Sequence, residues 1–336
     1  MRKEQITMND IARLAKVSRP VVYTVLNKRE GKGIHVSAST KERVLNICKE
    51  VGYVIPKSAR ELYSGISDRI AFLCQSLCPQ SSMLLESLQQ KAFERGIDLL
   101  VLITMGKPEL EVRYLNQLLD GRVDGLIAIS ETSGSIGRFI EYSSNPKNLR
   151  IIYVDGLHEG LTCVQNDKRA TAELALQLFR SEAREKPVFV SPYQSSELEM
   201  HFCEQARLSG YEPNCYIVDD SWSTDEILRQ NEVIFASGCD AVFASNDMLG
   251  VSLVNHAVKA GVKVPEAVSV LGVGDLQMAR YSSPSLSSIK IDYEQIAELS
   301  LNLMEQQIKN QAPVHTHHQI KPIITKRAST VLSREI

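Results

Sequence analysis

The chain has 336 residues, and no stretch of it approaches the ~20 consecutive apolar residues that a helix needs to span a bilayer. Its first residues, MRKEQITMND, also lack the apolar segment of a secretory signal. Both absences predict a cytoplasmic protein with no membrane partner.

The sequence has no C-x-x-C pair. Its seven cysteines are scattered, and Cys74 and Cys78, the two closest, match no common metal or redox spacing. We expect all seven to be reduced and mostly structural. The histidines of HTHHQ (His315, His317 and His318) have no Cys or carboxylate nearby, so a polar loop is favoured over a metal site. No metal and no cofactor are predicted.

Catalytic signatures are missing too. No G-x-G-x-x-G, G-x-x-x-x-G-K-[ST] or G-x-S-x-G motif occurs in a suitable context. The stretch REGKGIH resembles a phosphate loop only weakly, because no Ser or Thr follows its Gly-Lys pair. An enzyme on an α/β scaffold therefore has no residue pattern to support it, and we predict no catalytic residue.

Charge is unevenly distributed along the chain. Residues 1–65 hold 13 Lys and Arg against 6 Asp and Glu, a charge of +7, whereas the remainder carries −9. A basic head on an acidic body predicts that the head alone contacts a polyanion.

The head reads as three helices. Thr7 can cap the first, with Asp10 at the capping-box spacing, and an apolar stripe follows. Ser18 can cap the second, in which Pro20 occupies the first turn. A third helix is expected from near Ser37 to Gly52. The predicted core positions of the three helices are Ile11, Leu14, Ala15, Val22, Val25, Leu26, Val44, Ile47, Cys48 and Val51. Two helices joined by a very short turn match a helix-turn-helix.

Residues 54–66 form a predicted hinge. Pro56 stops any helix arriving from upstream, and KSAREL is too short to form a stable helix alone. From residue 67 the pattern alternates apolar strands with amphipathic helices, which predicts parallel sheets covered on both faces. Eight or so strand candidates favour two lobes. Lobe 1 is expected at residues 67–160 and 290–320, and lobe 2 at 161–289 and 321–336, after a DNA-binding domain at 1–53.

Several segments in order resemble the lactose/galactose-repressor family of bacterial transcription regulators. They are MNDIARLAKVSRPVVYTVLN, VSASTKERVLNICKEVGY, RVDGLIAIS, ASNDMLGVSLVNHAVKAGVKVPEAVSVLGVGD and SPSLSSIKID. The resemblance implies a helix-turn-helix head, a two-lobe core like that of periplasmic binding proteins, and a homodimer on a palindromic operator. It also implies that a small molecule between the lobes changes operator affinity.

The resemblance also assigns DNA-binding positions. Arg19 occupies the first base-reading position, where it can donate two hydrogen bonds to guanine, and Pro20 the second. Val21, Tyr23 and Thr24 depart from the Thr, Ser and Arg common in the family, so the operator cannot be inferred. Phosphate contacts are expected from Thr7, Asn27 and Tyr53, although a capping role for Thr7 fits equally well. Minor-groove contacts are expected from Ser58, Ala59 and Leu62, with Leu62 the candidate wedge between base pairs or, alternatively, packed on the lobe.

The expected effector cleft departs from the sugar-binding pattern of the family. Asp155 and Asn246 match polar positions, and Trp222 matches an aromatic platform or a packed edge residue. Leu198, Gly274 and Ile291 replace an Arg, an Asp and a Gln. Ser81 and Ser82 replace an aromatic pair. The remaining expected cleft positions are Phe202 and Asp275. Losing these polar groups predicts a less polar ligand, or none, instead of a monosaccharide.

The pattern of the two lobes alone leaves one other class of protein open. A solute-binding protein of a transport system shares their pattern, but the basic head and the missing signal segment disfavour it.

Overall fold

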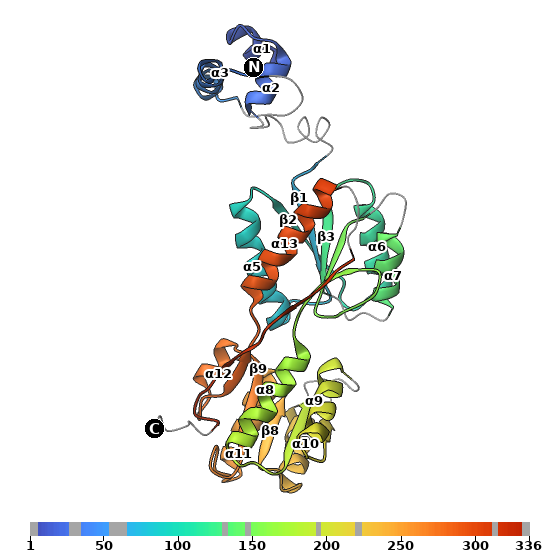
Figure 1. The fold of residues 1–336 in the computed structure, drawn as a ribbon, viewed down its shortest axis with the longest axis vertical. Helices are drawn as coiled ribbons and strands as arrows, with labels where there is room; N and C mark the ends of the chain where they lie inside the picture. Colours follow the sequence, from blue (N-terminus) through green and yellow to red (C-terminus); the bar gives the residue numbers. More distant parts are fainter. Residues whose placement is uncertain are drawn as a thin grey trace. The chain divides into compact units, whose positions relative to one another are not determined.

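A computed structural model describes residues 6–26, 35–53, 66–129, 134–144, 149–192, 196–218, 224–310 and 315–330. The chain divides into two compact units, Met1–Asp68 and Arg69–Ile336 (Figure 1). We refer to them as the head and the core and describe each by itself.

The head contains three helices, α1 (Met8–Leu14), α2 (Arg19–Leu26) and α3 (Ala38–Val51). The predicted capping box is confirmed, because the Asp10 amide donates to Thr7 Oγ1 and the Thr7 amide donates to the Asp10 carboxylate. Ser37 caps α3, which ends at Gly52 in the left-handed conformation that glycine adopts without strain.

The head core follows the predicted faces of the helices except at one position. Ile11, Val22 and Val44 are fully buried and pack together with Val25 and Cys48. Leu14, expected in the core, is 51% exposed. The last turn of α1 directs Ala15 inward, one residue further on, so Leu14 turns to solvent.

The first sheet of the core has six parallel strands in the order β11-β5-β4-β3-β1-β2. In chain order they are β1 (Arg69–Cys74), β2 (Asp98–Ile103), β3 (Gly125–Ile129), β4 (Ile151–Val154), β5 (Thr162–Asn166) and β11 (His317–Ile320). Helices α5 (Pro79–Glu94) and α13 (Tyr293–Asn310) cover one face, and α6 (Pro108–Leu118) and α7 (Ser135–Ser143) cover the other (Figure 1).

The second sheet has the order β12-β10-β9-β8-β6-β7, in which only β12 runs antiparallel to its neighbour. Its strands are β6 (Pro187–Ser191), β7 (Asn214–Ile217), β8 (Ala241–Ala244), β9 (Ser269–Gly274), β10 (Ser287–Lys290) and β12 (Ile323–Thr325). Helices α8 (Lys168–Ser181) and α9 (Glu197–Leu208) cover one face. Helices α10 (Thr224–Ala236), α11 (Asp247–Lys259) and α12 (Gln277–Tyr281) cover the other.

The chain passes between the two sheets after β5, after β10 and between β11 and β12. The expected lobe boundary at residue 160 precedes β5, yet β5 pairs with β4 and β11 of the first sheet. The first crossing therefore follows Asn166, because β5 completes the first sheet before α8 begins.

The predicted polar loop at HTHHQ is wrong. His317 and His318 belong to the edge strand β11, held by its parallel pairing with β5. The ring of His317 contacts the carbonyl oxygen of His158 instead of a metal ligand set. Within the described ranges, no His, Cys, Asp and Glu side chains group as a metal site would require. All seven cysteines are free thiols, as expected.

Candidate DNA-binding helix and effector cleft

The second helix of the head presents its first turn to solvent. Helices α1 and α2 are joined by only residues 15–18, and Lys16 adopts a positive φ of 52° there. Arg19 and Pro20 begin α2 and are both exposed. A short turn followed by an exposed helix start is the geometry of a helix-turn-helix, whose second helix contacts bases through its N-terminal residues.

Two of the predicted reading residues are engaged within the head. Val21 is half-buried and packs against the head core, because it lies beside Val22 and Val25 on the inward side of α2. The hydroxyl of Thr24 donates to the carbonyl oxygen of Pro20 over 3.0 Å. The reading face is therefore narrower than the sequence predicts.

The other predicted DNA contacts differ in their surroundings. Thr7 donates its hydroxyl to Asp10 within the capping box, which favours the capping role. Tyr53 follows the end of α3 and packs on the head core, where burial and Cys48 raise the pKa of its phenol although Arg19 lowers it. Tyr23 is half-buried. Asn27, Ser58, Ala59 and Leu62 lie outside the described residues.

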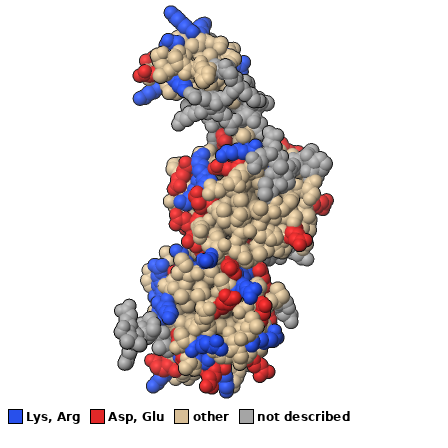
Figure 2. Space-filling model, in the orientation of Figure 1, with Lys and Arg blue, Asp and Glu red and all other residues tan. Residues whose placement is uncertain are grey.

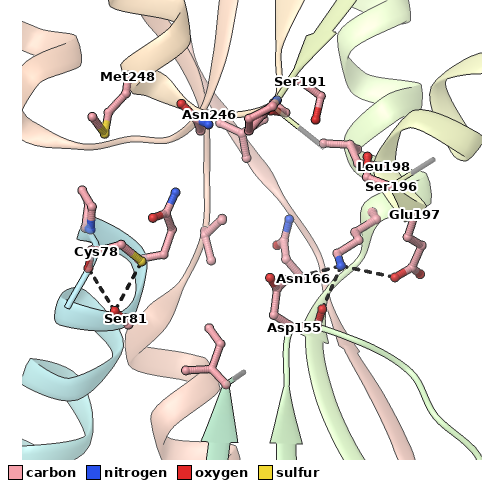
Figure 3. Close-up of a pocket in the computed structure, with 18 of the residues that line it drawn as sticks. Cys78, Ser81, Asp155, Asn166, Ser191, Ser196, Glu197, Leu198, Asn246 and Met248 are labelled. Carbon is pink, nitrogen blue, oxygen red and sulfur yellow. Dashed lines mark hydrogen bonds and ion pairs between the residues drawn. The ribbon is translucent and has the colours of Figure 1, made fainter. Parts of the chain in front are cut away.

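Within the core, a cleft of about 550 Å³ opens at the carboxyl ends of the strands of both sheets. Its walls come from the ends of β1, β3, β6 and β8 and from the first turns of α5, α8, α9 and α11 (Figure 3). Five of the predicted cleft residues line it, namely Ser81, Asp155, Leu198, Asn246 and Ile291.

Four other predicted residues, Ser82, Phe202, Gly274 and Asp275, are described by the structure but do not line the cleft. Phe202 is fully buried in the hydrophobic core, where its ring packs against Phe189 and Phe243. It lies one turn along α9 from Leu198, on the side of the helix that faces the sheet. Ser82 is exposed on α5 outside the lining. Trp222 is outside the described residues.

Gly274 and Asp275 serve the second lobe instead of the cleft. Asp275 accepts a hydrogen bond from the guanidinium of Arg327 and one from the hydroxyl of Thr325, so it anchors the returning C-terminal segment. A side chain at Gly274 would contact the buried carboxylate of Asp247. Asp247 itself accepts from Ser288 Oγ and the Leu276 amide, while burial raises its pKa.

A charged group that sequence reasoning missed lies beside Asp155. The ammonium of Lys168 lies 3.4 Å from Asp155 Oδ1 and 3.2 Å from Glu197 Oε2, and it donates to the Asp155 carbonyl oxygen over 2.8 Å. Gln165 donates to the other oxygen of Glu197. Figure 3 shows Asp155, Asn166 and Glu197 together on one side of the cleft.

The electrostatics keep both partners of this pair charged. Burial disfavours the ammonium of Lys168, but Asp155 and Glu197 offset burial and raise its pKa. Burial likewise opposes ionisation of Glu197, but Lys168 and the Gln165 hydrogen bond more than offset it and lower the pKa. The only feature of the sequence that could have predicted this pair is its placement at helix starts, since Lys168 begins α8 and Glu197 begins α9.

The rest of the lining is uncharged. Its apolar side chains include Ile129, Leu198, Met248, Val273 and Ile291, and serines and glutamines lie among them. Figure 3 shows Met248 and Cys78, the N-cap of α5, on the side of the cleft away from Asp155 and Glu197. Asn246 also lines the cleft, but its side-chain oxygen caps α11 by accepting from the Leu249 amide. Such a cleft suits a ligand with one polar end and an apolar body.

Comparison with known proteins agrees with this architecture. Residues 7–55 match the family of bacterial regulatory proteins of the lacI type, and residues 158–330 match the periplasmic binding protein-like domain. The ribose operon repressor of Escherichia coli K12 is 26% identical over 96% of this chain and 99% of its own. The transcriptional repressor PurR of Photobacterium profundum is 23% identical over 96% and 98%.

Solved structures share the fold over the whole length. A lac repressor dimer bound to operator and the anti-inducer ONPF superposes with a TM-score of 0.78 at 20% identity, covering 98% of this chain and all of that one. A complex of the transcriptional regulator CelR with cellobiose has a TM-score of 0.66 at 19% identity, covering 96% and 99%. No helix in the described part of this chain is long and apolar enough to cross a membrane. The chain belongs to the lacI family of transcription regulators, a family without enzymes, and is a DNA-binding repressor with a periplasmic-binding-protein-like ligand-binding core.

Proposed function

We propose that the protein represses transcription as a homodimer on a palindromic operator, and that a small molecule in the interlobe cleft modulates its affinity for DNA. The observation that supports this most strongly is the exposed first turn of α2, with Arg19 at its start. Arg19 can donate two hydrogen bonds to guanine in the major groove.

The narrow polar face of α2 suggests that bases are read with few hydrogen bonds. Pro20 offers only apolar contact, and the Thr24 hydroxyl is engaged by the helix backbone. DNA shape and the hinge would then supply more of the specificity than direct contacts. Under this proposal Ser58, Ala59 and Leu62 enter the minor groove, where Leu62 opens a base step.

A candidate dimer face lies along one side of the core. Phe93 at the end of α5 is 80% exposed, and Tyr281 at the end of α12 is 82% exposed. Leu100 and Val101 on the edge strand β2 and Met278 on α12 are also exposed. Figure 1 shows α5 and α12 on the same side of the core. Exposed apolar side chains on these elements favour association, and a twofold pairing would supply two heads for two half-sites.

The charge pattern of the surface agrees with a head that binds DNA. On the face that Figure 2 shows, Lys and Arg stand out at the surface of the head beside one acidic patch, whereas basic and acidic side chains are interspersed over the core. Phosphate contacts from such a head would weaken as salt rises.

The effector we propose is not a conventional monosaccharide. Leu198 and Ile291 line the cleft, where an Arg and a Gln would each have bound a hydroxyl. Asp275 is held by Arg327 and lies outside the lining. A site that discriminates sugars needs polar groups paired to each hydroxyl, and Leu198 and Ile291 offer none at these two positions.

Operator selection in vitro, followed by footprinting, tests the DNA-binding proposal. Symmetric protection of two half-sites by a species of twice the chain mass is the expected result. An asymmetric footprint or a monomer at full occupancy would contradict it, and absence of any sequence preference would favour a solute-binding protein. Calorimetry with hexoses and pentoses tests the effector proposal, which micromolar binding of a simple sugar would overturn.

A further inference from the structure

We propose that the cleft ligand is an amphipathic organic cation, a protonated amine whose nitrogen binds Asp155 and whose apolar body contacts the apolar lining residues Met248, Val273 and Ile291. This inference rests on the proposed role of the cleft as an effector site. It names the ligand class from the charge balance and the hydrogen-bond balance of the described lining residues.

The first step concerns the donors of Lys168, the only cationic side chain among the described lining residues. An ammonium has three N–H groups. Lys168 has three acceptors around it, which are the carbonyl oxygen and Oδ1 of Asp155 and Oε2 of Glu197. One of these contacts is a hydrogen bond and two are ion pairs, so the charge of Lys168 is already balanced, and its side chain is only 20% exposed. An anionic ligand would have to displace one of these contacts.

The second step concerns Asp155. Its side chain is 48% exposed, and its Oδ1 atom faces Lys168 at 3.4 Å. Its Oδ2 atom has no hydrogen-bond or ion-pair partner among the described residues. Asp155 therefore offers an unused charged acceptor in the cleft. A charged acceptor forms its strongest hydrogen bonds with a cationic donor.

The third step is the sum of charges. Asp155 and Glu197 contribute two negative charges and Lys168 contributes one positive charge, and the other described lining residues are neutral types. The cleft therefore carries a net charge of about −1, which attracts a cation and repels an anion.

A buried amide adds a second acceptor that has no donor. Asn166 is 6% exposed and lines the cleft, and its Nδ2 donates to Thr171 Oγ1. The Thr171 hydroxyl already donates to the Asp167 carbonyl oxygen, so it can only accept from Asn166, which fixes the orientation of the amide. Oδ1 of Asn166 is left without a partner among the described residues. A second N–H of an ammonium ligand could satisfy it after a small movement of the side chain.

The apolar lining residues define the rest of the ligand. Met248, Val273 and Ile291 present no hydrogen-bonding group to a polyol, whereas an alkyl or aryl chain gains from their burial. A primary amine on such a chain matches both Asp155 and these apolar side chains, which neither a sugar nor a free carboxylate does.

Calorimetry on the full-length protein tests the cation proposal with three probes of similar shape, hexylamine, hexan-1-ol and hexanoate. A fourth probe, 2-phenylethylamine, tests an aryl chain in place of the alkyl chain. We expect an amine to bind at least about tenfold more tightly than the alcohol, because the alcohol lacks the charged hydrogen bond. We expect hexanoate to bind more weakly still. Tighter binding of the alcohol or of hexanoate, or no binding of either amine at about 10 mM, would overturn the proposal.

Variants locate the contact. Asp155→Asn removes the charge and is expected to weaken amine binding about tenfold or more. The control Glu173→Gln makes the same change on exposed α8 surface, outside the cleft, and is expected to bind as the wild type does. Unchanged binding by Asp155→Asn would overturn the assignment. The comparison of amine with alcohol on the wild type needs no variant, so it stands even if Asp155→Asn fails to fold.

Operator binding is measured on the same preparations. If the wild-type protein shows no sequence-specific DNA binding, the proposed function is contradicted. Retained DNA binding without amine binding would contradict only the cation proposal.

Discussion

The ammonium of Lys168 donates a hydrogen bond to the backbone carbonyl oxygen of Asp155 over 2.8 Å. Lys168 begins α8, which packs on the second sheet, and Asp155 follows β4 of the first sheet. Gln165 on β5 of the first lobe donates to Glu197 on α9 of the second, which is a second contact between the lobes. These contacts join the two lobes beside the cleft, so the ligand proposed at Asp155 would bind where the lobes are linked.

Replacing Lys168 with Met is expected to destabilise the core by about 1–3 kcal/mol. The substitution keeps the approximate length of the side chain but leaves the carboxylates of Asp155 and Glu197 without their cation. Removing one partner of a buried ion pair costs about 3–5 kcal/mol, and the partial exposure of this group reduces that value. Urea unfolding monitored by circular dichroism measures the change.

Arg169→Met is the matched control for this prediction. Arg169 is the next residue along α8, and its ion pair with Glu173 is exposed on both sides. Its loss is expected to change stability by less than about 0.5 kcal/mol. Equal effects of the two substitutions would show that Lys168 does not link the lobes.

The pKa of Glu197 predicts how this link responds to acid. Because its pKa in the folded protein lies below its ordinary value, Glu197 stabilises the fold fully above about pH 4.5, and that contribution is lost as pH falls through the lowered pKa. We therefore expect the stability difference between the wild type and Glu197→Gln to be constant from pH 6 to 8 and to shrink on acidification below about pH 4.5. Unfolding titrations at a series of pH values measure it, and a difference that grows in acid would reverse the sign we assign.

Much of the architecture could be predicted because it rests on local patterns. Capping of α1 and α3 and the alternation of long apolar strands with helices are visible in the sequence. Strands β5, β10, β11 and β12 are not among the longer apolar runs that predict strands, because each has only three to five residues and β5, β10 and β11 are rich in polar residues. They form only because neighbouring strands, and partners such as Gln307 for Thr162, satisfy their polar groups.

The cleft was predicted less well than the fold. A helix places Leu198 in the cleft and Phe202 in the core only one turn apart, and the sequence does not show which side of α9 faces which. Asp275 was assigned to the ligand because the partner that holds it, Arg327, lies 52 residues away. The pairing of Lys168 with Asp155 and Glu197 likewise depends on how the two sheets meet.

Arg19→Ala is expected to cost about 1–3 kcal/mol at one symmetric pair of operator positions and to relax the base preference there. The reason is loss of a two-pronged hydrogen bond to guanine at the start of α2. Binding to an operator panel substituted at every position measures the effect. Arg13→Ala serves as the control, since Arg13 is exposed on α1 and pairs with Asp10. Uniform weakening on all sequences by Arg19→Ala would instead indicate a phosphate contact.

Thr24→Val is expected to leave operator affinity and base preference unchanged within about 0.5 kcal/mol. Valine keeps the shape and the methyl contacts of threonine, and the hydroxyl it removes already donates to the carbonyl oxygen of Pro20. A hydroxyl bonded to its own helix is not available to a base unless it breaks that hydrogen bond. The same operator panel measures the result. A loss of more than about 1 kcal/mol confined to one base pair would show that Thr24 leaves Pro20 on binding and reads DNA directly.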